Sequence, residues 1–113
     1  MSDCIFCKIA AGEIPSDKIY EDDICLAFRD IHPQAPVHFL VVPKTHIRWA
    51  NDITPENSGV VAHCFEVIAK LAKQEKLDEG YRIINNCGEA AGQTVPHIHF
   101  HVLAGRPLGE GLV

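Results

Sequence analysis

The sequence lacks a long apolar run. No window of its 113 residues approaches the roughly 20 apolar residues of a membrane span, and residues 1–8 contain no apolar stretch long enough for a signal peptide. We therefore expect a cytoplasmic protein that does not bind membranes. Repeats, low-complexity segments and linkers are also missing, so residues 1–113 are expected to form one domain.

Positive charge is scarce. Lys plus Arg number 10 against 15 Asp plus Glu, which gives a formal net charge of −5. This balance argues against a protein that coats nucleic acid. It does not exclude a single nucleotide, because backbone N–H groups and a few polar side chains are enough to hold one phosphate.

The cysteines also lack the even number that a set of disulfides would need. The five cysteines are an odd number, and the cytosol keeps thiols reduced, so a disulfide framework is not expected. The Cys4/Cys7 pair has metal-ligand spacing, but a closed zinc site needs two further ligands. A thioredoxin-like redox pair is a weaker alternative, because it should follow a strand and only three residues precede Cys4. Free thiols on a helix remain the third possibility.

Hydrophobic periodicity predicts five strands and two helices. Thr54 as N-cap and Pro55 at the first helical position predict the start of the longer helix, and Gly12 is a possible cap for the shorter one. The expected elements are a short helix over 4–11, strands at 18–20, 24–28 and 37–42, a long helix over 55–76, and strands at 81–85 and 98–103. This order predicts an α+β fold, a five-stranded antiparallel sheet with the long helix on one face.

Three of the seven histidines stand at alternate positions, His97, His99 and His101. On a strand they project from one face, while the apolar residues between them face the core. One metal ion bound by all three is excluded, because the outer two are roughly 13 Å apart on a straight strand. Nucleophilic catalysis at phosphorus fits better, because neutral imidazole attacks without first losing a proton. Half-exposed strand histidines without a function are the alternative.

The Gly-rich loop before these histidines suits a phosphate. It offers amide, hydroxyl and backbone N–H groups that can stabilise charge on phosphate oxygens. The residues concerned are Asn86, Gly88, Gly92, Gln93 and Thr94.

The run His97-Ile-His99-Phe-His101-Val-Leu closely resembles the histidine triad (HIT) signature, His-φ-His-φ-His-φ-φ with φ apolar. Gly92-Gln-Thr-Val-Pro96 resembles the stretch that precedes it in that family. Further similar segments are Ile5-Phe6, Glu13-Ile-Pro15, Ala27-Phe-Arg-Asp-Ile31, Pro33-Gln-Ala-Pro36, Val42-Pro-Lys44 and Gly80-Tyr-Arg82. The resemblance is greatest to the nucleotide-binding (Hint-like) branch, and it implies a HIT-like fold, a homodimer and nucleotide hydrolysis.

The resemblance also implies catalytic roles. It makes His99 the nucleophile that attacks the α-phosphorus and forms a nucleotidyl-histidine intermediate, with His101 at a phosphate-contacting position and His97 at a supporting one. Thr94 stands where the family often has serine, and its hydroxyl can still donate to the phosphate. His38 is expected to orient His99 or His101, unless it is only a packed strand histidine.

Nucleotide-binding and metal-binding residues are implied in the same way. Asp30 matches the residue that binds ribose hydroxyls, although it could be an ordinary turn residue, and Asn86 and Gly92 match phosphate-side positions. Walls around a purine base, each of which could equally be core, are implied for Phe6, Ile9, Ile14, Phe28 and Ile31. Some family members hold a structural zinc, which here would be bound by Cys4, Cys7, His46 and His97. Catalysis is expected to need no cofactor.

The expected function is hydrolysis of purine nucleoside phosphoramidates or related AMP derivatives. A dinucleoside polyphosphate hydrolase would use the same residues, and a zinc-stabilised nucleotide-binding or adaptor protein without significant turnover is an alternative of another class. The ten residues after Leu103 include Arg106 and resemble the Gly-Arg continuation of the nucleotide-binding branch. We expect this tail to border the site without forming a second nucleotide pocket, which favours phosphoramidates.

Overall fold

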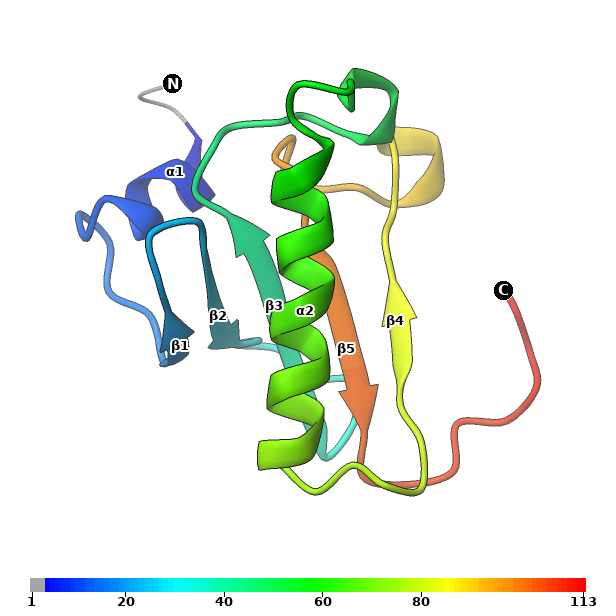
Figure 1. The fold of residues 1–113 in the computed structure, drawn as a ribbon. Helices are drawn as coiled ribbons and strands as arrows, with labels where there is room; N and C mark the ends of the chain where they lie inside the picture. The colour runs from blue at the N-terminus through cyan, green and yellow to red at the C-terminus, as the bar shows by residue number, and fades with distance from the viewer. Residues whose placement is uncertain (1–3) are drawn as a thin grey trace.

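The computed structural model describes residues 4–113 as a five-stranded antiparallel sheet crossed on one face by a long helix (Figure 1). The strand order is β1-β2-β3-β5-β4. The elements are α1 (Ile5–Ala10), β1 (Lys18–Glu21), β2 (Cys25–Arg29), β3 (Val37–Pro43), the 3₁₀ turn η1 (Ala50–Asp52), α2 (Ser58–Gln74), β4 (Arg82–Ile84), the 3₁₀ turn η2 (Glu89–Ala91) and β5 (Phe100–Ala104). The predicted α+β class is confirmed. None of the helices in this part of the chain is long and apolar enough to cross a membrane.

Helix α2 begins three residues later than predicted. Thr54 does not cap it; the Thr54 N–H donates to the Asn57 side chain at 2.7 Å, and the Ser58 N–H donates to the Thr54 carbonyl at 2.8 Å. These bonds fold residues 54–57 into a turn ahead of the helix. At the other end Lys76 has a φ of 61°, and the Leu77 N–H reaches the Ala72 carbonyl at 2.8 Å. This Schellman-type closure ends the helix before residue 76.

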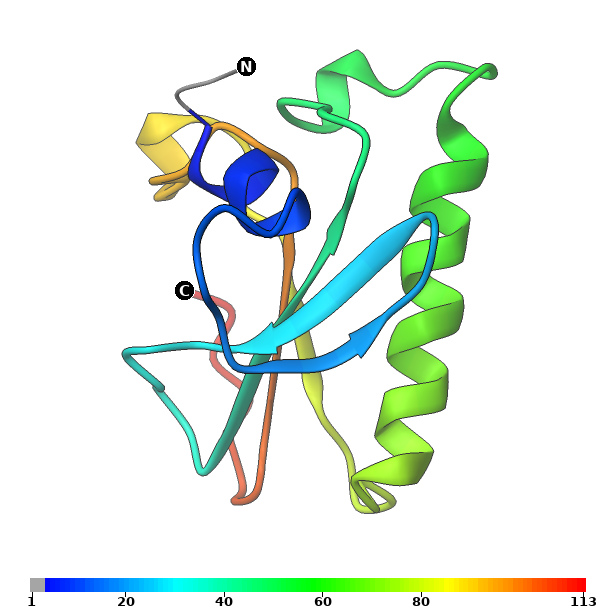
Figure 2. The same cartoon turned by 90° about the vertical axis from the view of Figure 1, so that its left-hand side faces the viewer.

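The main core lies between α2 and the sheet. The apolar stripe of α2 supplies Cys64, Val67, Ile68, Leu71 and Ala72, all buried. The periodicity predicted four of these but not Val67, and it placed in the stripe Phe65, which is 44% exposed. The opposite face of the sheet carries a smaller core built from α1, β2 and β3, in which Phe6 and Ile9 pack on Leu26, Phe28 and Leu40. Figure 2 shows α1 and the loop that contains η2 on this second side, opposite α2.

Strand β5 begins at Phe100, two residues later than predicted. The Ile98 N–H donates instead to the Ile47 carbonyl at 2.6 Å, so the chain before Phe100 follows the segment after β3. The expected alternation nevertheless holds, because Ile98, Phe100 and Val102 lie in the α2-side core. The three histidines are therefore directed to the other side, although only His101 belongs to the strand.

Candidate active site

His99 is held as a neutral imidazole with one nitrogen committed to the backbone. Its side chain is buried, its Nδ1 lies 2.8 Å from the His97 carbonyl oxygen, and the ring packs edge-to-face on Phe6 at 5.0 Å. Because a carbonyl can only accept, Nδ1 must carry the proton, which leaves a lone pair on Nε2. Burial lowers the pKa of His99 below its ordinary value of 6.5. The geometry therefore prepares Nε2 to act as a nucleophile near neutral pH.

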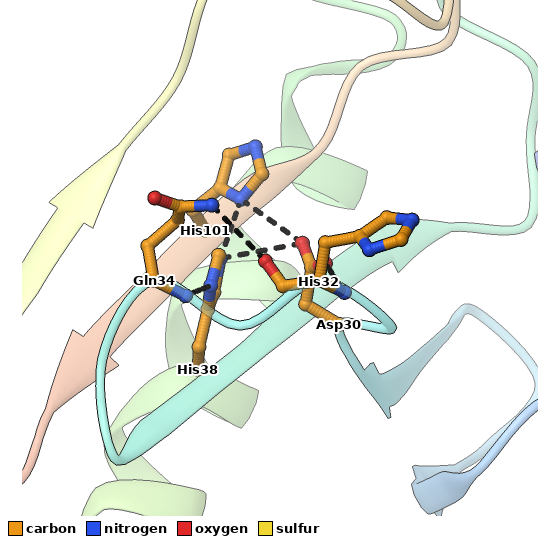
Figure 3. Close-up of polar contacts among 5 residues, drawn as sticks. All are labelled: Asp30, His32, Gln34, His38 and His101. Carbon is orange, nitrogen blue, oxygen red and sulfur yellow. Dashed lines mark hydrogen bonds and ion pairs between the residues drawn. The ribbon is translucent and has the colours of Figure 1, made fainter.

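A hydrogen-bonded chain fixes the protonation of His101 (Figure 3). The Gln34 N–H donates to His38 Nδ1 at 3.0 Å, so in neutral His38 the proton is on Nε2. That nitrogen lies 2.9 Å from His101 Nδ1 and 3.4 Å from the Asp30 carboxylate. His101 Nδ1 then accepts from His38, which leaves His101 Nε2–H as a donor.

Burial also sets the charge of this pair. It lowers the pKa of His38 against the opposing effect of Asp30, and together with the neighbouring His99 and His38 it lowers the pKa of His101 to about 4. Both rings are therefore neutral near pH 7. The structure places His38 against His101, which is one of the two partners expected for it.

A cavity of about 370 Å³ gathers most of the predicted site residues. Its lining includes Asp30, Gly92, Thr94, His99 and His101, together with apolar residues. The apolar lining includes Phe6, Ile9, Ile14, Phe28 and Ile31. Ile31 is 86% exposed, so it forms the rim of the cavity and not part of the core. A mainly apolar lining with a few polar groups is the usual form of a small-ligand site.

Asn86 is the one predicted nucleotide-binding residue that does not line this cavity. Its side chain lies beside Gly92, where an added Cβ would be 3.9 Å from Asn86 Nδ2. Gly92 itself has a φ of 91°, a conformation that favours glycine. The loop is therefore bent at Gly92, with Asn86 behind the bend.

Gln93 was expected to face a phosphate, but its side chain instead holds the loop together. It is buried, and its amide nitrogen donates to the carbonyls of Arg48 at 2.8 Å and Val95 at 3.0 Å. Its oxygen accepts the Gly88 N–H at 2.7 Å. Both amide hydrogens are thus used within the protein, which corrects the expectation that Gln93 offers a donor to the ligand.

Asn85 contacts the site although the sequence pattern did not predict it there. The Asn85 side chain donates to the His99 carbonyl at 2.9 Å and accepts from the Cys87 thiol at 3.4 Å. A polar residue directly after the last apolar residue of a strand was the available signal. The pattern alone does not reveal which carbonyl such a side chain reaches.

A second constellation lies beside the nucleophile and consists of Cys4, Cys7, His46 and His97. Cys4 Sγ is 3.3 Å from His97 Nδ1, Cys7 Sγ is 3.3 Å from His46 Nδ1, and Cys7 Sγ is 3.6 Å from His97 Nδ1. Ligand atoms that surround one zinc tetrahedrally at about 2.1–2.3 Å are themselves about 3.5 Å apart. The four side chains therefore fit a tetrahedral zinc ion.

The second nitrogen of His97 supports the same interpretation. His97 Nε2 lies 2.8 Å from the Pro43 carbonyl, so it carries the proton, and the Nδ1 lone pair faces the two sulfurs. A backbone acceptor behind a histidine ligand is the usual way to fix its tautomer. Burial and the neighbouring Cys4 raise the pKa of the Cys7 thiol to about 11, so the thiolate form needs a cation to stabilise it. His97 thus has two functions, because its carbonyl also holds His99.

Comparison with known proteins gives consistent matches. The sequence matches the family model of the HIT domain over residues 11–108. It is 49% identical over 109 residues to the purine nucleoside phosphoramidase of Escherichia coli K12, covering 96% of this chain and 92% of that protein. It is 52% identical over 106 residues to an uncharacterized HIT-like protein of Synechococcus elongatus, covering 94% and 93%.

Solved structures similar to this chain come from the same family. A histidine triad protein from Clostridium difficile superposes with a TM-score of 0.94 at 53% identity, covering 98% of this chain and 97% of that one. A HIT family hydrolase from Legionella pneumophila gives a TM-score of 0.92 at 47% identity, covering 95% and 96%. Fold and sequence therefore lead to the same family.

Proposed function

This chain belongs to the HIT domain family, and we propose on that premise that it hydrolyses purine nucleoside phosphoramidates or related AMP derivatives through a covalent nucleotidyl-histidine intermediate. The observation that carries the proposal is the state of His99, a buried neutral imidazole whose Nδ1 proton is bound by the His97 carbonyl at 2.8 Å. The relative from E. coli that is 49% identical is named a purine nucleoside phosphoramidase, which supports the same reaction here.

In the proposed reaction, His99 Nε2 forms a bond to the α-phosphorus while the bond from phosphorus to the leaving group breaks. The Nε2–H of His101 and the hydroxyl of Thr94, which line the same cavity, donate to the phosphate oxygens as their charge grows. Water then hydrolyses the adduct and restores His99. His38 keeps His101 in the tautomer that donates, which makes His38 a positioning residue.

The nucleoside part is proposed to occupy the rest of the cavity. Asp30 offers a carboxylate to the ribose hydroxyls; its Oδ1 already accepts the His32 N–H at 2.7 Å, but a carboxylate has further lone pairs. The purine base would lie against the wall formed by Phe6 and Phe28, whose rings pack edge-to-face at 5.6 Å, with Ile14 beside them. Gly92 and Asn86 would shape the phosphate end from the loop.

We further propose that Cys4, Cys7, His46 and His97 hold a structural zinc ion. The ion would tie α1 to the segment after β3 and to the backbone that carries His99, without taking part in the reaction. None of the five cysteines is in a disulfide, as in proteins of a reducing compartment, and we place the protein in the cytoplasm.

A homodimer is the proposed assembly. Strand β4 ends the sheet, and in residues 4–113 nothing pairs with its outer edge; Figure 1 shows β4 at the side of the sheet away from β1. Two large apolar side chains near it are exposed, Phe65 on α2 by 44% and Tyr81 before β4 by 39%. Pairing of two β4 edges about a two-fold axis would continue the sheet and cover both side chains.

A single-turnover experiment tests the function. Protein in excess is mixed with adenosine phosphoramidate labelled at the α-phosphorus and quenched with acid-free denaturant. The wild type should carry label on protein, His99→Gly should carry none while still binding AMP, and His32→Gln, a matched change on an exposed loop, should label normally. Unlabelled wild-type protein that binds AMP would instead favour a nucleotide-binding or adaptor role.

A further inference from the structure

A second cavity, of about 510 Å³, lies beside the nucleotide cavity. Its lining consists of Cys4, Ile5, His46, Arg48, Thr94, Val95 and Pro96. Ile5, Thr94 and Val95 also line the nucleotide cavity, so the two cavities share a wall. Both are lined by residues of α1 and of the loop before β5, and these segments lie on the side of the sheet opposite α2 (Figure 2). A group attached to a phosphate at Thr94 therefore lies at the edge of the second cavity.

The two cavities differ in charge. The nucleotide cavity is lined by Asp17, Asp30 and Arg29, whose guanidinium is already paired with Glu75 at 3.0 Å. The second cavity is lined by Arg48 and by no carboxylate residue. Within residues 4–113, no carboxylate lies within ion-pair distance of Arg48. On a chain with a net charge of −5, this cavity is a local positive region, which attracts an anionic group.

Arg48 is also held in position. Its carbonyl accepts from Gln93 at 2.8 Å, and its guanidinium carbon lies 4.8 Å from the centre of the Trp49 ring, a cation–π distance. Trp49 in turn packs on Gly88, where an added Cβ would be only 2.9 Å from the indole. The segment is thereby fixed to the phosphate loop, which lowers the entropy lost when Arg48 binds a ligand.

We propose that this cavity binds the leaving-group side of the substrate and selects an amine that carries a carboxylate, as an amino acid linked to phosphorus through its nitrogen does. The inference rests on the proposed function. A second nucleoside fits less well, because the lining has no carboxylate to accept from ribose hydroxyls. The cavity volume is within the usual range for small ligands, about 300–1,000 Å³.

The chemistry at phosphorus is the same for every such amine. The bond from His99 Nε2 to phosphorus forms, the P–N bond breaks, and the nitrogen leaves with the electron pair of that bond and a proton from water. Arg48 is therefore a specificity residue that contacts the departing group and takes no part in bond making. Its effect should appear as a ratio between two substrates, since a ratio cancels general effects on the enzyme.

Three adenosine phosphoramidates test the proposal, one unsubstituted, one carrying β-alanine and one carrying β-alaninamide. The last two differ only by a carboxylate and its neutral amide. We expect wild-type kcat/KM to favour the carboxylate by about fivefold, the upper range for an exposed ion pair, and 1 M salt to reduce this preference. Arg48→Gln should remove the preference and Arg48→Glu should reverse it, whereas Lys73→Gln, which removes a charge from the exposed end of α2, should retain it.

Each other outcome overturns the proposal. Equal kcat/KM for the β-alanine and β-alaninamide substrates in wild type would show that the cavity does not distinguish a carboxylate from its amide. An acid-to-amide ratio that is unchanged in Arg48→Gln would show the same for Arg48. A larger effect of Arg48→Gln on diadenosine tetraphosphate than on the β-alanine substrate would assign the cavity to phosphate instead. No hydrolysis of any of the three phosphoramidates, including the unsubstituted one, would overturn the proposed function and the subsite with it.

Discussion

The side-chain amide of Asn85 donates a 2.9 Å hydrogen bond to the backbone carbonyl of His99. The pairing of β4 with β5 ends at Ile84 and His101, so the His99 carbonyl lies just beyond the last paired residues. The Asn85 side chain donates to this carbonyl, whereas within a sheet a backbone N–H of the neighbouring strand would do so. The chain after β4 is thereby free to turn away into the phosphate loop while His99 stays fixed at both its ring and its carbonyl.

We predict that Asn85→Leu, which keeps the size of the side chain, lowers kcat more than it raises KM. The His99 carbonyl would lose its donor, and a nucleophile displaced by a fraction of an ångström loses on the order of tenfold in rate, since about 1 Å can cost 10²-fold. Steady-state kinetics and the rate of His99 labelling measure the effect. Cys87→Ser, which keeps a donor to the Asn85 oxygen, is the matched control and should stay near wild type. An Asn85→Leu enzyme with an unchanged labelling rate would show that this bond does not position His99.

Much of the fold could be predicted because hydrophobic period and strand order are encoded locally. The alternation of Ile98, Phe100 and Val102 with the histidines correctly separated the two faces of the sheet. The predicted start of α2 was wrong, because the Asn57 side chain accepts the Thr54 N–H and the Ser58 N–H donates to the Thr54 carbonyl, which makes residues 54–57 a separate turn ahead of the helix. The capping pattern at Thr54 and Pro55 does not reveal that the chain forms this turn first.

The site was predictable in its residue types and less so in its bonds. The histidine spacing and the resemblance led to His99 and the Cys4/Cys7 pair as candidates, because these depend on positions in the chain. Two partners of the histidines were not identified, since Gln34 reaches the His38 ring through a backbone N–H and Asn85 reaches the His99 carbonyl through a side-chain amide. Such contacts depend on how loops meet in space and leave no periodic signal.

The buried neutral His101 predicts a loss of stability in acid. In the unfolded chain this histidine takes up a proton near its ordinary pKa of 6.5, but in the folded chain only near 4. The unfolded state therefore binds more protons between these values, and the free energy of unfolding should fall with decreasing pH, by on the order of 3 kcal/mol for this residue. Urea denaturation of wild type and His101→Asn at pH 7.5, 6 and 5 measures it. The variant should have a shallower pH slope; parallel slopes would contradict the assignment.

The metal quartet, formed by Cys4, Cys7, His46 and His97, predicts about one zinc ion per chain in protein purified without chelator. Because the ion would bind only the folded state, Cys4→Ser or His46→Ala should lower metal content and Tm together, and EDTA should do the same to wild type. Plasma emission spectrometry and thermal denaturation make the comparison. Cys87→Ser, outside the quartet, should keep both values. The site would be ruled out by metal-free protein whose Tm does not rise when zinc is added.

The open edge of β4 predicts a symmetric dimer of two 12.5 kDa chains. Tyr81→Glu should weaken it by at least about tenfold, because a charge on the covered face must be desolvated. Ile24→Glu is a matched change, since Ile24 is 41% exposed in the turn between β1 and β2, at the other end of the sheet, and should remain dimeric. Sedimentation equilibrium at micromolar concentration decides the question. A monomeric wild type would remove the β4 edge as an interface.

The last prediction concerns the leaving group and follows from where the C-terminal segment lies. Arg106 donates to the Gln34 carbonyl at 3.3 Å and to the Pro107 carbonyl at 3.2 Å, while Arg82 donates to the Gly109 carbonyl at 2.6 Å. None of the residues 105–113 lines either cavity, so this segment offers no pocket for a second nucleoside. The cavity beside Thr94 lacks the carboxylate that ribose hydroxyls would need.

A dinucleoside polyphosphate would thus gain little transition-state binding from its second half, whereas an amine leaving group needs no such pocket. We predict that kcat/KM for an adenosine phosphoramidate exceeds that for diadenosine tetraphosphate by at least about tenfold, or roughly 1.4 kcal/mol. Both substrates are assayed with the same enzyme preparation, and Arg106→Gln is included because a cation that left the Gln34 carbonyl would attract extra phosphates. The variant should leave the ratio unchanged. Equal or reversed efficiencies in wild type would instead identify a polyphosphate hydrolase, and a ratio that rises in Arg106→Gln would mean that this side chain contacts the polyphosphate.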